Sequence, residues 1–411
     1  MSILIKGGTV VTQDSSRRVI AADVLIERNK IKSIGKHKVG EADQIIDAKG
    51  KIVMPGLINL HSHVSMATMR GIADDVTFDQ FLERTFAADV KRTKEGILEG
   101  ATLGCMESVL TGTTSFLDLY YGEDLVAKAV EEVGIRGFLS WAVLDDDKTT
   151  QKGSPIKNAA RFIEKWKGHK LVTPAVGPQG VYVCSEETMH KARELANRKR
   201  TFCHYHLSET RGEVYKHLSA TQKRPVDWLA EIGFLHKGDV AAHACWITKH
   251  EAQALADSGT SVAHCPTSNL KLAVGGVAPV IEINECGGTV GLGTDGCSSN
   301  NSLDMFTEMK VCALLHKHSR WDPTAMSAQR VLDMATVEGA KALGMEKKLG
   351  SIEEGKLADV IVVDSTRIGM APTNRNNAVS NLVYSCCGQF VFCTIVNGEI
   401  IAYDGQLACG F

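Results

Sequence analysis

His61 and His63, one residue apart at the end of the apolar run Gly56-Leu57-Ile58-Asn59-Leu60, are the residues best placed to do chemistry. On a β-strand the side chains of residues i and i+2 point to the same face, so two imidazoles there can bind one metal ion from one edge of a sheet. The spacing alone is a weak signal because the chain has 14 histidines. The pair gains weight because further His and Asp residues end later apolar runs in a regular series.

Two other histidine pairs have the same spacing, His204/His206 and His316/His318. We expect His204, which shares a strand face with His206, to have a structural or supporting role. His316 and His318 follow residues 302–311 in what we predict to be one helix. Residues i and i+2 of a helix diverge by about 200°, so this pair cannot chelate together and is expected to be solvated or half-buried.

Eight short β-type runs alternate with helical patterns after residue 56. The predicted strands cover residues 57–63, 113–119, 136–143, 171–178, 201–207, 239–246, 261–268 and 288–296. Among the helical patterns, 124–133 should end at Gly134, and 322–344 should open at Asp322-Pro323. Eight such units predict an α/β fold, a parallel (β/α)8 barrel of the TIM type, over residues 56–349.

Short β-type runs broken by Gly and Asn/Asp turns fill both ends of the chain, residues 1–55 and 350–411. Neither end has enough strand to bury a face alone. We therefore expect the two ends to meet in one small composite β-domain, a β-sandwich that flanks the barrel.

The composition indicates a globular protein: 411 residues, 44% hydrophobic and 23% charged, with a formal net charge of -2. This balance gives no reason to expect nucleic acid, a membrane or a polyanionic substrate as a partner. No apolar stretch reaches about 18 residues and the N-terminus lacks a signal-peptide pattern, so we expect a cytoplasmic location. The 12 cysteines show no repeated C-x-x-C pair and are predicted to be free thiols in a reducing compartment.

Eight motifs follow one another along nearly the whole chain. They are PGLINLHSH at 55–63, MRG at 69–71, GTTS at 112–115, HLSET at 206–210, AH at 242–243, HCPTSNLKL at 264–272, GTDG at 293–296 and GSIEEGKLAD at 350–359. Together they resemble the amidohydrolase superfamily, and more closely its branch of adenosine-type and triazine aminohydrolases and chlorohydrolases. In proteins with this pattern, a His pair of the first strand, a His of the fifth and an Asp of the eighth bind one divalent metal ion at the C-terminal face of the barrel. The resemblance implies these ligands here: His61, His63, His206 and Asp295.

The positions of these four residues agree with that implication, because all of them end predicted strands, where barrel enzymes place their chemistry. Three imidazoles and one carboxylate suit Zn²⁺ or Fe²⁺, with an open position for water. The alternatives are a core histidine at His206 and a helix N-cap at Asp295. The fourth predicted strand, 171–178, has no lysine that could bridge two ions as in binuclear relatives, which favours a single metal ion.

The expected reaction is hydrolytic deamination. A metal-bound water with a pKa near about 7 becomes hydroxide, which attacks a ring carbon that bears an amino group. Ammonia leaves only when protonated, so a carboxyl group must carry a proton to the ring nitrogen and the amine; the resemblance to the family's deaminases gives this role to Glu209. Asp295 could also take the water's proton, and His243 could stabilise the developing charge. The alternatives are a capping or solvated Glu209 and a core His243.

The positions expected to hold substrate differ from those usual in adenosine-type deaminases, which carry a Trp, a Glu, an Arg and a Pro-His pair. Phe81 stands at the Trp position, Trp141 at the Arg position, and Gln179 in place of the His, while the Glu region reads FAAD at 86–89. Phe81 or Trp141 could stack on a flat heterocycle, and Gln179 could hydrogen-bond its edge, with barrel packing as the alternative for the two aromatic rings. We therefore expect a small planar amino-heterocycle as substrate: a purine, pterin, pyrimidine or triazine, or a nucleoside.

Two other functions are compatible with these residues. A metal hydroxide could remove chloride or an alkylamine from an s-triazine-like ring, a reaction that needs the proton relay of Glu209 less. A non-catalytic scaffold is the other alternative, and the intact set of four metal ligands with Glu209 argues against it. By analogy with relatives we also expect a homo-oligomer.

Overall fold

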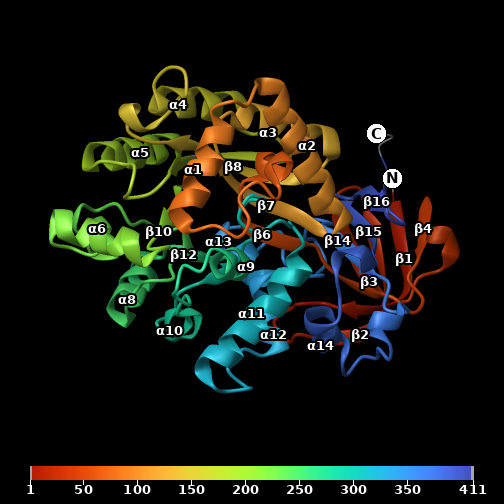
Figure 1. Cartoon of the computed structure of the whole chain (residues 1–411). Coiled ribbons are helices and arrows are strands. Elements are labelled where there is room, and N and C mark those ends of the chain that lie inside the picture. The colour runs from red at the N-terminus through yellow and green to blue at the C-terminus, as the bar shows by residue number, and fades with distance from the viewer. Residues whose placement is uncertain (1, 409–411) are drawn as a thin grey trace.

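The computed structural model of the protein describes residues 2–408 and has two four-stranded parallel sheets at its centre (Figure 1). The strands of the first sheet, in order, are β6 (Leu57–Ser62), β7 (Thr113–Tyr120), β8 (Arg136–Val143) and β9 (Val172–Pro178). Those of the second are β10 (His204–Leu207), β11 (Val240–His243), β12 (Ser261–His264) and β13 (Val290–Leu292). Isolated parallel bridges pair Ser62 with Asp295, just after β13, and Val176 with Cys203, just before β10. The predicted α/β class with parallel strands is confirmed.

Each predicted strand of the central region has a counterpart, but several end earlier than predicted. The predicted strand 239–246 ends at His243, because His243 and Ala244 have positive φ angles of 73° and 51°, which break the pleat. The predicted strand 261–268 ends at His264, because Pro266 begins helix α9 (Pro266–Lys271). The residues after His243 therefore lie in a loop, and those after His264 begin a helix.

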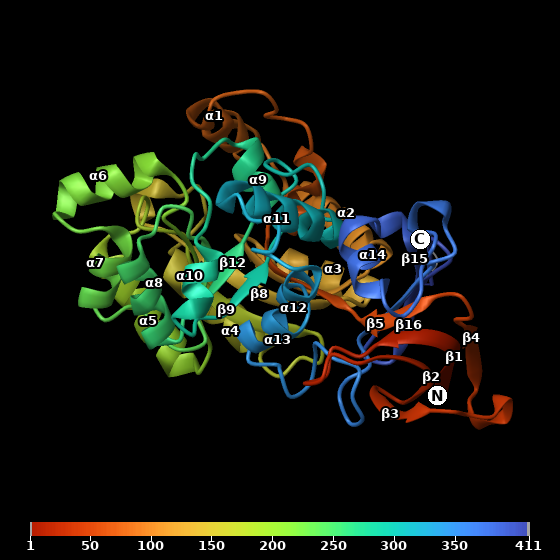
Figure 2. The same cartoon turned by 90° about the horizontal axis from the view of Figure 1, so that it is seen from below.

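Helices surround the two sheets in both views (Figures 1 and 2). They include α2 (Lys94–Leu110), α3 (Glu123–Val133), α4 (Pro155–Trp166), α5 (Glu186–Lys199), α6 (Arg211–Thr221), α7 (Pro225–Glu231), α8 (Lys249–Ser258), α10 (Val280–Glu285) and α11 (Met305–Arg320). The sequence of α4 is strongly amphipathic, and this helix buries Ala159, Phe162 and Ile163 on one side. The predicted helix 124–133 is confirmed as α3, which Gly134 ends with a φ of 85°.

The predicted helix 322–344 is wrong in its bounds. The structure has two short helices there, α12 (Ala328–Met334) and α13 (Val337–Ala342). Asp322 accepts hydrogen bonds from the backbone N–H and the hydroxyl of Thr324, so it closes a turn instead of capping a helix. Ser327 caps α12 by accepting from the N–H of Arg330.

Both ends of the chain contribute to one nine-stranded sheet beside the parallel sheets (Figure 2). Its strands are β1 (Ser2–Val11), β2 (Val19–Glu27), β3 (Lys30–Gly35), β4 (Gln44–Asp47), β5 (Ile52–Pro55), β14 (Val360–Val363), β15 (Val391–Val396), β16 (Glu399–Tyr403) and β17 (Gln406–Leu407), and α14 (Ala378–Tyr384) lies between β14 and β15 in the chain. β5 pairs with β1 on one side and antiparallel with β14 on the other. A buried ion pair between Arg136 of β8 and Asp359, 3.0 Å long, links this sheet to the parallel strands.

The interior between the parallel strands is apolar below the carboxyl ends of the strands. Its buried side chains include Ile58, Leu60, Leu117, Phe138, Val240, Ala242 and Ala263. Towards the carboxyl ends the buried side chains become polar and include His61, Ser140, His204 and His206. A packed apolar layer therefore supports a polar layer, and burying that polar layer is favourable only if its groups are hydrogen-bonded or bind an ion.

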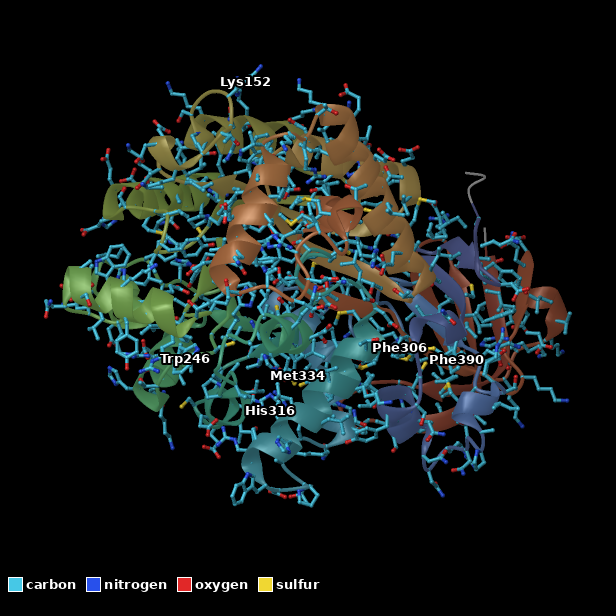
Figure 3. The ribbon with its side chains drawn as sticks, viewed as in Figure 1. Lys152, Trp246, Phe306, His316, Met334 and Phe390 are labelled. Carbon is cyan, nitrogen blue, oxygen red and sulfur yellow. The ribbon has the colours of Figure 1, made fainter. Side chains whose placement is uncertain are left out.

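The prediction that His316 and His318 are solvated or half-buried is wrong for His316. Both lie on α11 and differ in environment, as a helix requires: His318 is exposed, whereas His316 (Figure 3) is buried with its Nε2 3.2 Å from that of His264. The reason is packing, because α11 buries the face that carries Met309, Cys312 and His316.

Two further expectations concern the chain as a whole. Among the described residues, no helix combines the length and apolar character needed to cross a membrane. The cysteines of residues 2–408 are free thiols, and most of them are buried.

Candidate active site

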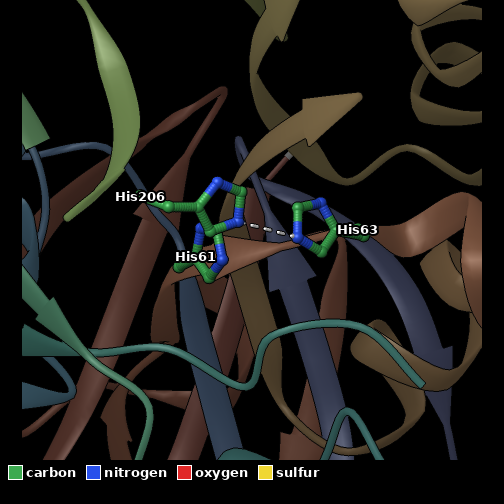
Figure 4. A group of neighbouring side chains, drawn as sticks. All are labelled: His61, His63 and His206. Carbon is green, nitrogen blue, oxygen red and sulfur yellow. Dashed lines mark hydrogen bonds between the residues drawn. The ribbon is translucent and has the colours of Figure 1, made fainter. Parts of the chain in front are cut away.

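Imidazole and carboxylate groups from different strands converge at the carboxyl ends of the parallel sheets. His61 lies on β6, His63 follows it directly, His206 lies on β10, and Figure 4 shows the three rings facing one another. The Nε2 atoms of His63 and His206 are 3.4 Å apart. Asp295, which follows β13, places its Oδ1 3.4 Å from His61 Nε2 and 3.2 Å from His63 Nε2. The structure thus brings together the four predicted ligands.

Hydrogen bonds behind two of the imidazoles set which ring nitrogen carries the proton. His63 Nδ1–H donates to the carbonyl of Leu119 at 2.5 Å, and His206 Nδ1–H donates to that of Gln179 at 2.7 Å. Because a carbonyl can only accept, the Nε2 atoms of the two rings are left to face each other. In the neutral forms that bind a metal ion, two lone pairs 3.4 Å apart would repel unless a cation lay between them, so these residues fit a metal ion.

His204 orients the imidazole of His61. Its Nε2 lies 2.9 Å from His61 Nδ1, and its Nδ1 lies 3.4 Å from the carbonyl of Asp118. With His204 Nδ1–H donating to Asp118, His204 Nε2 accepts the proton of His61 Nδ1, which leaves His61 Nε2 bare. That buried nitrogen has no hydrogen-bond partner among the described residues, as expected for an atom that binds an ion. His204 therefore supports the ligand set from behind.

The charge states of the cluster also fit an ion. Burial lowers the pKa of His61 well below its usual value and that of His206 to about 3, so both rings are neutral. Burial raises the pKa of Asp295, but the neighbouring His61 and His63 imidazoles outweigh burial and hold the pKa well below its usual range. The pKa of His63 is raised instead, because burial, which lowers it, is outweighed by the hydrogen bond and charge of Asp295. Neutral imidazoles and an ionised carboxylate are the forms that bind zinc, so His61, His206 and Asp295 are already in those forms and His63 would release its proton to the ion.

Asp295 is held by three hydrogen bonds. Ser268 and Ser299 donate their hydroxyls to Oδ2 at 2.6 and 2.9 Å, and the backbone N–H of Gly296 donates to Oδ1 at 2.8 Å. Asp295 has a φ of 63°, a region that non-glycine residues enter at a cost of about 1–3 kcal/mol. Ser208 and His243, which follow or end neighbouring strands, share this strain with φ of 47° and 73°. The hydrogen bonds and packing around the site hold these turns in place.

Glu209 lies three residues after His206 and lines the cavity beside the cluster. Its side chain is 12% exposed, and its Oε2 is 4.0 Å from His243 Nε2. Burial, with a smaller contribution from the charge of Asp295, raises the pKa of Glu209 to about 8, so this carboxyl holds a proton at neutral pH. Thr210, not Glu209, caps helix α6.

Glu213 fastens the turn that carries Glu209. Its carboxylate accepts the backbone N–H groups of Ser208 at 2.9 Å and Glu209 at 2.8 Å, while its own N–H donates to the side chain of Thr210 at 3.0 Å. Glu213 was not among the residues predicted from the sequence. The signal was present, because Glu three residues after Thr at a helix start is the capping-box pattern.

The substitution Glu213→Gln should lower kcat by about tenfold and leave metal content unchanged, because an amide has one acceptor oxygen and cannot hold both N–H groups in place. Turnover and metal analysis by mass spectrometry measure both quantities. Glu251→Gln is the matched control: Glu251 is also buried at the start of a Thr-capped helix, α8, where it accepts the N–H of Thr248. Both variants should lose about 1–2 kcal/mol of stability. An equal loss of kcat in the two would contradict a positioning role for Glu213.

His243 closes the cluster from the end of β11. Its Nδ1 lies 3.0 Å from the side-chain amide of Asn269, and burial lowers its pKa, so the ring is neutral. Its ligand atom lies within 4.8 Å of those of His61 and Asp295. Asn269, which contacts His243, and Ser268, which contacts Asp295, both belong to the motif HCPTSN. The motif did not indicate which site residues these two side chains contact.

A cavity of about 400 Å³ opens over the cluster. Phe81, on helix α1 (Phe78–Asp89), and Gln179, directly after β9, are two predicted substrate residues, and both line it. A cavity of this size is within the range of small-molecule sites.

Trp141, the third predicted substrate residue, does not line the cavity. Its ring packs 5.6 Å from that of Phe162 in α4, and its Nε1–H donates to Gln151 at 2.8 Å. Strand alternation explains this, because the neighbours Ser140 and Ala142 point inward, towards the histidine cluster and the cavity wall. These contacts fit a packing role for Trp141 better than contact with the substrate. Its indole is linked to the cavity wall only through the hydrogen bond to Gln151.

Comparison with known proteins agrees with this geometry. The amidohydrolase family matches residues 52–401. The chain belongs to the amidohydrolase family. This amidohydrolase is 43% identical to the 5-methylthioadenosine/S-adenosylhomocysteine deaminase of Thermococcus onnurineus, over 99% of this chain and 95% of that protein. It is 40% identical to the 5'-deoxyadenosine deaminase of Methanothermobacter thermautotrophicus, over 99% of this chain and 94% of that protein.

Solved structures are similar over the whole amidohydrolase chain. An adenosine deaminase from Xanthomonas campestris with bound zinc has a TM-score of 0.95 at 29% identity, covering 100% of this chain and 94% of the other. An atrazine chlorohydrolase from Arthrobacter aurescens in complex with zinc has a TM-score of 0.90 at 26% identity, covering 100% and 97%. Family membership, with relatives named as deaminases, makes this protein a hydrolytic enzyme that acts on C–N bonds.

Proposed function

We propose that this amidohydrolase is a metal-dependent deaminase that releases ammonia from an amino-substituted N-heterocycle of about nucleoside size. One observation carries the proposal: the carboxyl group of Glu209, 12% exposed, shares a cavity with side chains arranged to bind an ion. Deamination needs both, since water must be activated and the leaving nitrogen protonated. The relatives named as adenosine-type deaminases support the same reaction.

Four residues would hold one divalent ion: His61, His63, His206 and Asp295. Such an ion supplies Lewis-acid activation of water. Three nitrogen donors and one oxygen donor suit zinc, as the zinc in the two solved relatives supports, and would also suit Fe²⁺. A single ion is favoured because β9 contains no lysine that could bridge two.

The remaining groups would transfer protons and stabilise the charge that develops during the reaction. Glu209 would deliver a proton to the ring nitrogen and then to the leaving amine, a role that its raised pKa suits at neutral pH. Asp295, held by Ser268 and Ser299, would accept the proton of the attacking water. His243, neutral and 4.0 Å from Glu209, would hydrogen-bond the oxygen that gains charge.

Two cavity residues would orient the heterocycle. Phe81 offers an aromatic face on which a flat ring can stack, and Gln179 offers an amide that can bond the ring edge. Trp141 is left out of this set because it lies outside the cavity wall.

The second candidate function is removal of chloride or an alkylamine from an s-triazine-like ring, and the likeness to atrazine chlorohydrolase favours it. A panel of aminopurines, their nucleosides, pterins, pyrimidines, amino-triazines and chloro-triazines separates the two. We expect ammonia release from an aminated substrate with kcat/KM of about 10⁴ M⁻¹s⁻¹ or more. Coupled assays for ammonia and an ion-selective electrode for chloride measure the products. Faster release of chloride than of ammonia would reverse the assignment.

The fold supports two finer proposals. The bridges from Ser62 to Asp295 and from Val176 to Cys203 support closure of the two parallel sheets into one (β/α)8 barrel over residues 56–349. The nine-stranded sheet supports a separate composite β-domain of residues 1–55 and 350–411, whereas its folding as a sandwich stays a prediction. A cytoplasmic location and a homo-oligomeric state stay predictions.

A further inference from the structure

A second group of metal-binding side chains lies outside the cavity. His264 ends β12, and Cys312 and His316 lie one helical turn apart on α11, where Figure 3 labels His316. One ligand atom from each of the three, a ring nitrogen or the sulfur, lies within 4.8 Å of the other two. None of the three residues lines the cavity over the active site. The group is therefore separate from the catalytic cluster.

Two different elements bring these residues together. Residues i and i+4 of a helix lie on the same side, and Cys312 and His316 both belong to the buried side of α11. His264 faces them from the end of β12: its Nε2 is 3.2 Å from that of His316, and the planes of the two rings are inclined at 65°. All three residues are at most 1% exposed. Side chains in this arrangement can bind one ion between a strand and the helix that covers it.

A hydrogen bond between the two rings does not account for all their nitrogens. Burial lowers the pKa of His264 well below its usual value and that of His316 to about 4, so each neutral ring has one nitrogen with a lone pair. A single bond between the Nε2 atoms uses one of these lone pairs and leaves the other bare. The Nδ1 atoms of both rings have no hydrogen-bond partner among the described residues. Such buried nitrogens are uncommon, whereas an ion would take a lone pair from both rings.

Two imidazoles and a thiol restrict the kind of ion. A thiolate is a soft ligand that favours Zn²⁺ or Cu⁺, whereas Mg²⁺ and Ca²⁺ require oxygen ligands. Burial raises the pKa of the Cys312 thiol, so a bound ion would displace the thiol proton, as zinc does at structural sites. The cation would also balance the charge of the buried thiolate.

We propose that His264, Cys312 and His316 bind a second metal ion, Zn²⁺ or Cu⁺, which fastens α11 to the end of β12. The inference goes beyond the proposed function, since it requires no reaction at this site. From His264 the chain continues to Ser268 and Asn269, whose side chains contact two residues of the catalytic cluster. The second ion would therefore support the segment that holds the catalytic cluster in place.

Metal content tests the proposal when the protein is produced in media supplemented with zinc or with copper. The ion is then present while the chain folds, so burial of the site does not prevent loading. Wild-type protein should hold about one ion per chain more than Cys312→Ala, as measured by mass spectrometry, and the medium that supplies this extra ion identifies it as zinc or copper. Equal metal contents of the two proteins in both media would overturn the inference.

Cys105→Ala is the matched control for this substitution. Cys105 is equally buried on a helix, α2, but belongs to none of the possible metal-binding groups of the described residues. This variant should keep the metal content of the wild type. A loss of metal as large as that of Cys312→Ala would show a general effect of removing a buried thiol and would overturn the assignment.

Absorption spectra test the sulfur ligand without any measurement of activity. Protein loaded with Co²⁺ in place of Zn²⁺, or with Cu⁺, should show a thiolate-to-metal charge-transfer band in the near ultraviolet. His206→Ala should keep this band, because the catalytic cluster contains no cysteine, and His316→Ala should lose it even if Cys312→Ala does not fold. Absence of the band from both wild-type preparations, or its persistence in His316→Ala, would overturn the site.

Discussion

Replacing Glu209 by glutamine is expected to lower kcat by about 10² or more while the protein keeps its metal ion. Glutamine preserves the size of the side chain but carries no proton that it can transfer, so the leaving amine would depart unprotonated. The position makes this a test of chemistry and not of metal binding, because Glu209 belongs to none of the three possible metal-binding groups formed by the described residues. Its carboxyl is buried in the cavity with its pKa raised to about 8 by burial.

Steady-state ammonia release and metal analysis on the same preparation measure the two halves of this prediction. The control is Glu251→Gln, which alters a fully buried glutamate that does not line the cavity and should leave kcat near the wild-type value. Turnover within about threefold of wild type in Glu209→Gln would remove Glu209 from the proton relay. Loss of the metal ion in that variant would instead show that the carboxyl supports the ion.

Replacing His206 by alanine is expected to reduce metal affinity by more than about 10², with a parallel loss of activity. The substitution removes one of the facing Nε2 lone pairs at 3.4 Å and leaves His63 without its partner across the proposed ion. Metal content after dialysis against a weak chelator measures the effect, and added zinc should restore part of the activity if the remaining ligands still assemble.

His316→Ala is the control that separates metal loss from general damage. His316 is also a fully buried histidine of an i, i+2 pair, but it lies on α11 against His264 and outside the cavity wall. His316 forms a separate possible metal-binding group with His264 and Cys312, which shares no residue with the four proposed ligands. Its replacement should therefore cost stability without changing the metal held by His61, His63, His206 and Asp295. Full metal occupancy in His206→Ala, or equal loss of activity together with metal in both variants, would contradict the four-residue ligand set.

Much of the fold could be predicted from the sequence because the patterns that indicate strands and helices are local. Alternating β-type and helical runs predicted the parallel strands, and β8 has the predicted bounds. The same patterns overestimated the length of β11, since apolar residues continue past His243 although the backbone turns there. A hydrophobic run records burial, and burial does not distinguish a strand from the loop that follows it.

For the site, the sequence by itself determined which residue types stand at the ends of strands, namely His61, His63, His206 and Asp295, and these are the groups that converge. Residues that act through others were decided only by tertiary structure. Glu213 holds the Glu209 turn and Asn269 contacts His243, and neither relation follows from spacing.

Trp141 shows most clearly which feature of the site the sequence determined and which one only the tertiary structure decided. The sequence determined that an aromatic residue sits on β8, but only the register of the strand decided that Ser140 and Ala142 face inward and that the indole packs on α4. The physical reason is that side chains alternate between the two faces of a strand, so a shift of one residue exchanges cavity for packing. The identity of the metal-binding residues is therefore a local property of this sequence. The pairing of distant strands, in contrast, decides which aromatic ring contacts the substrate.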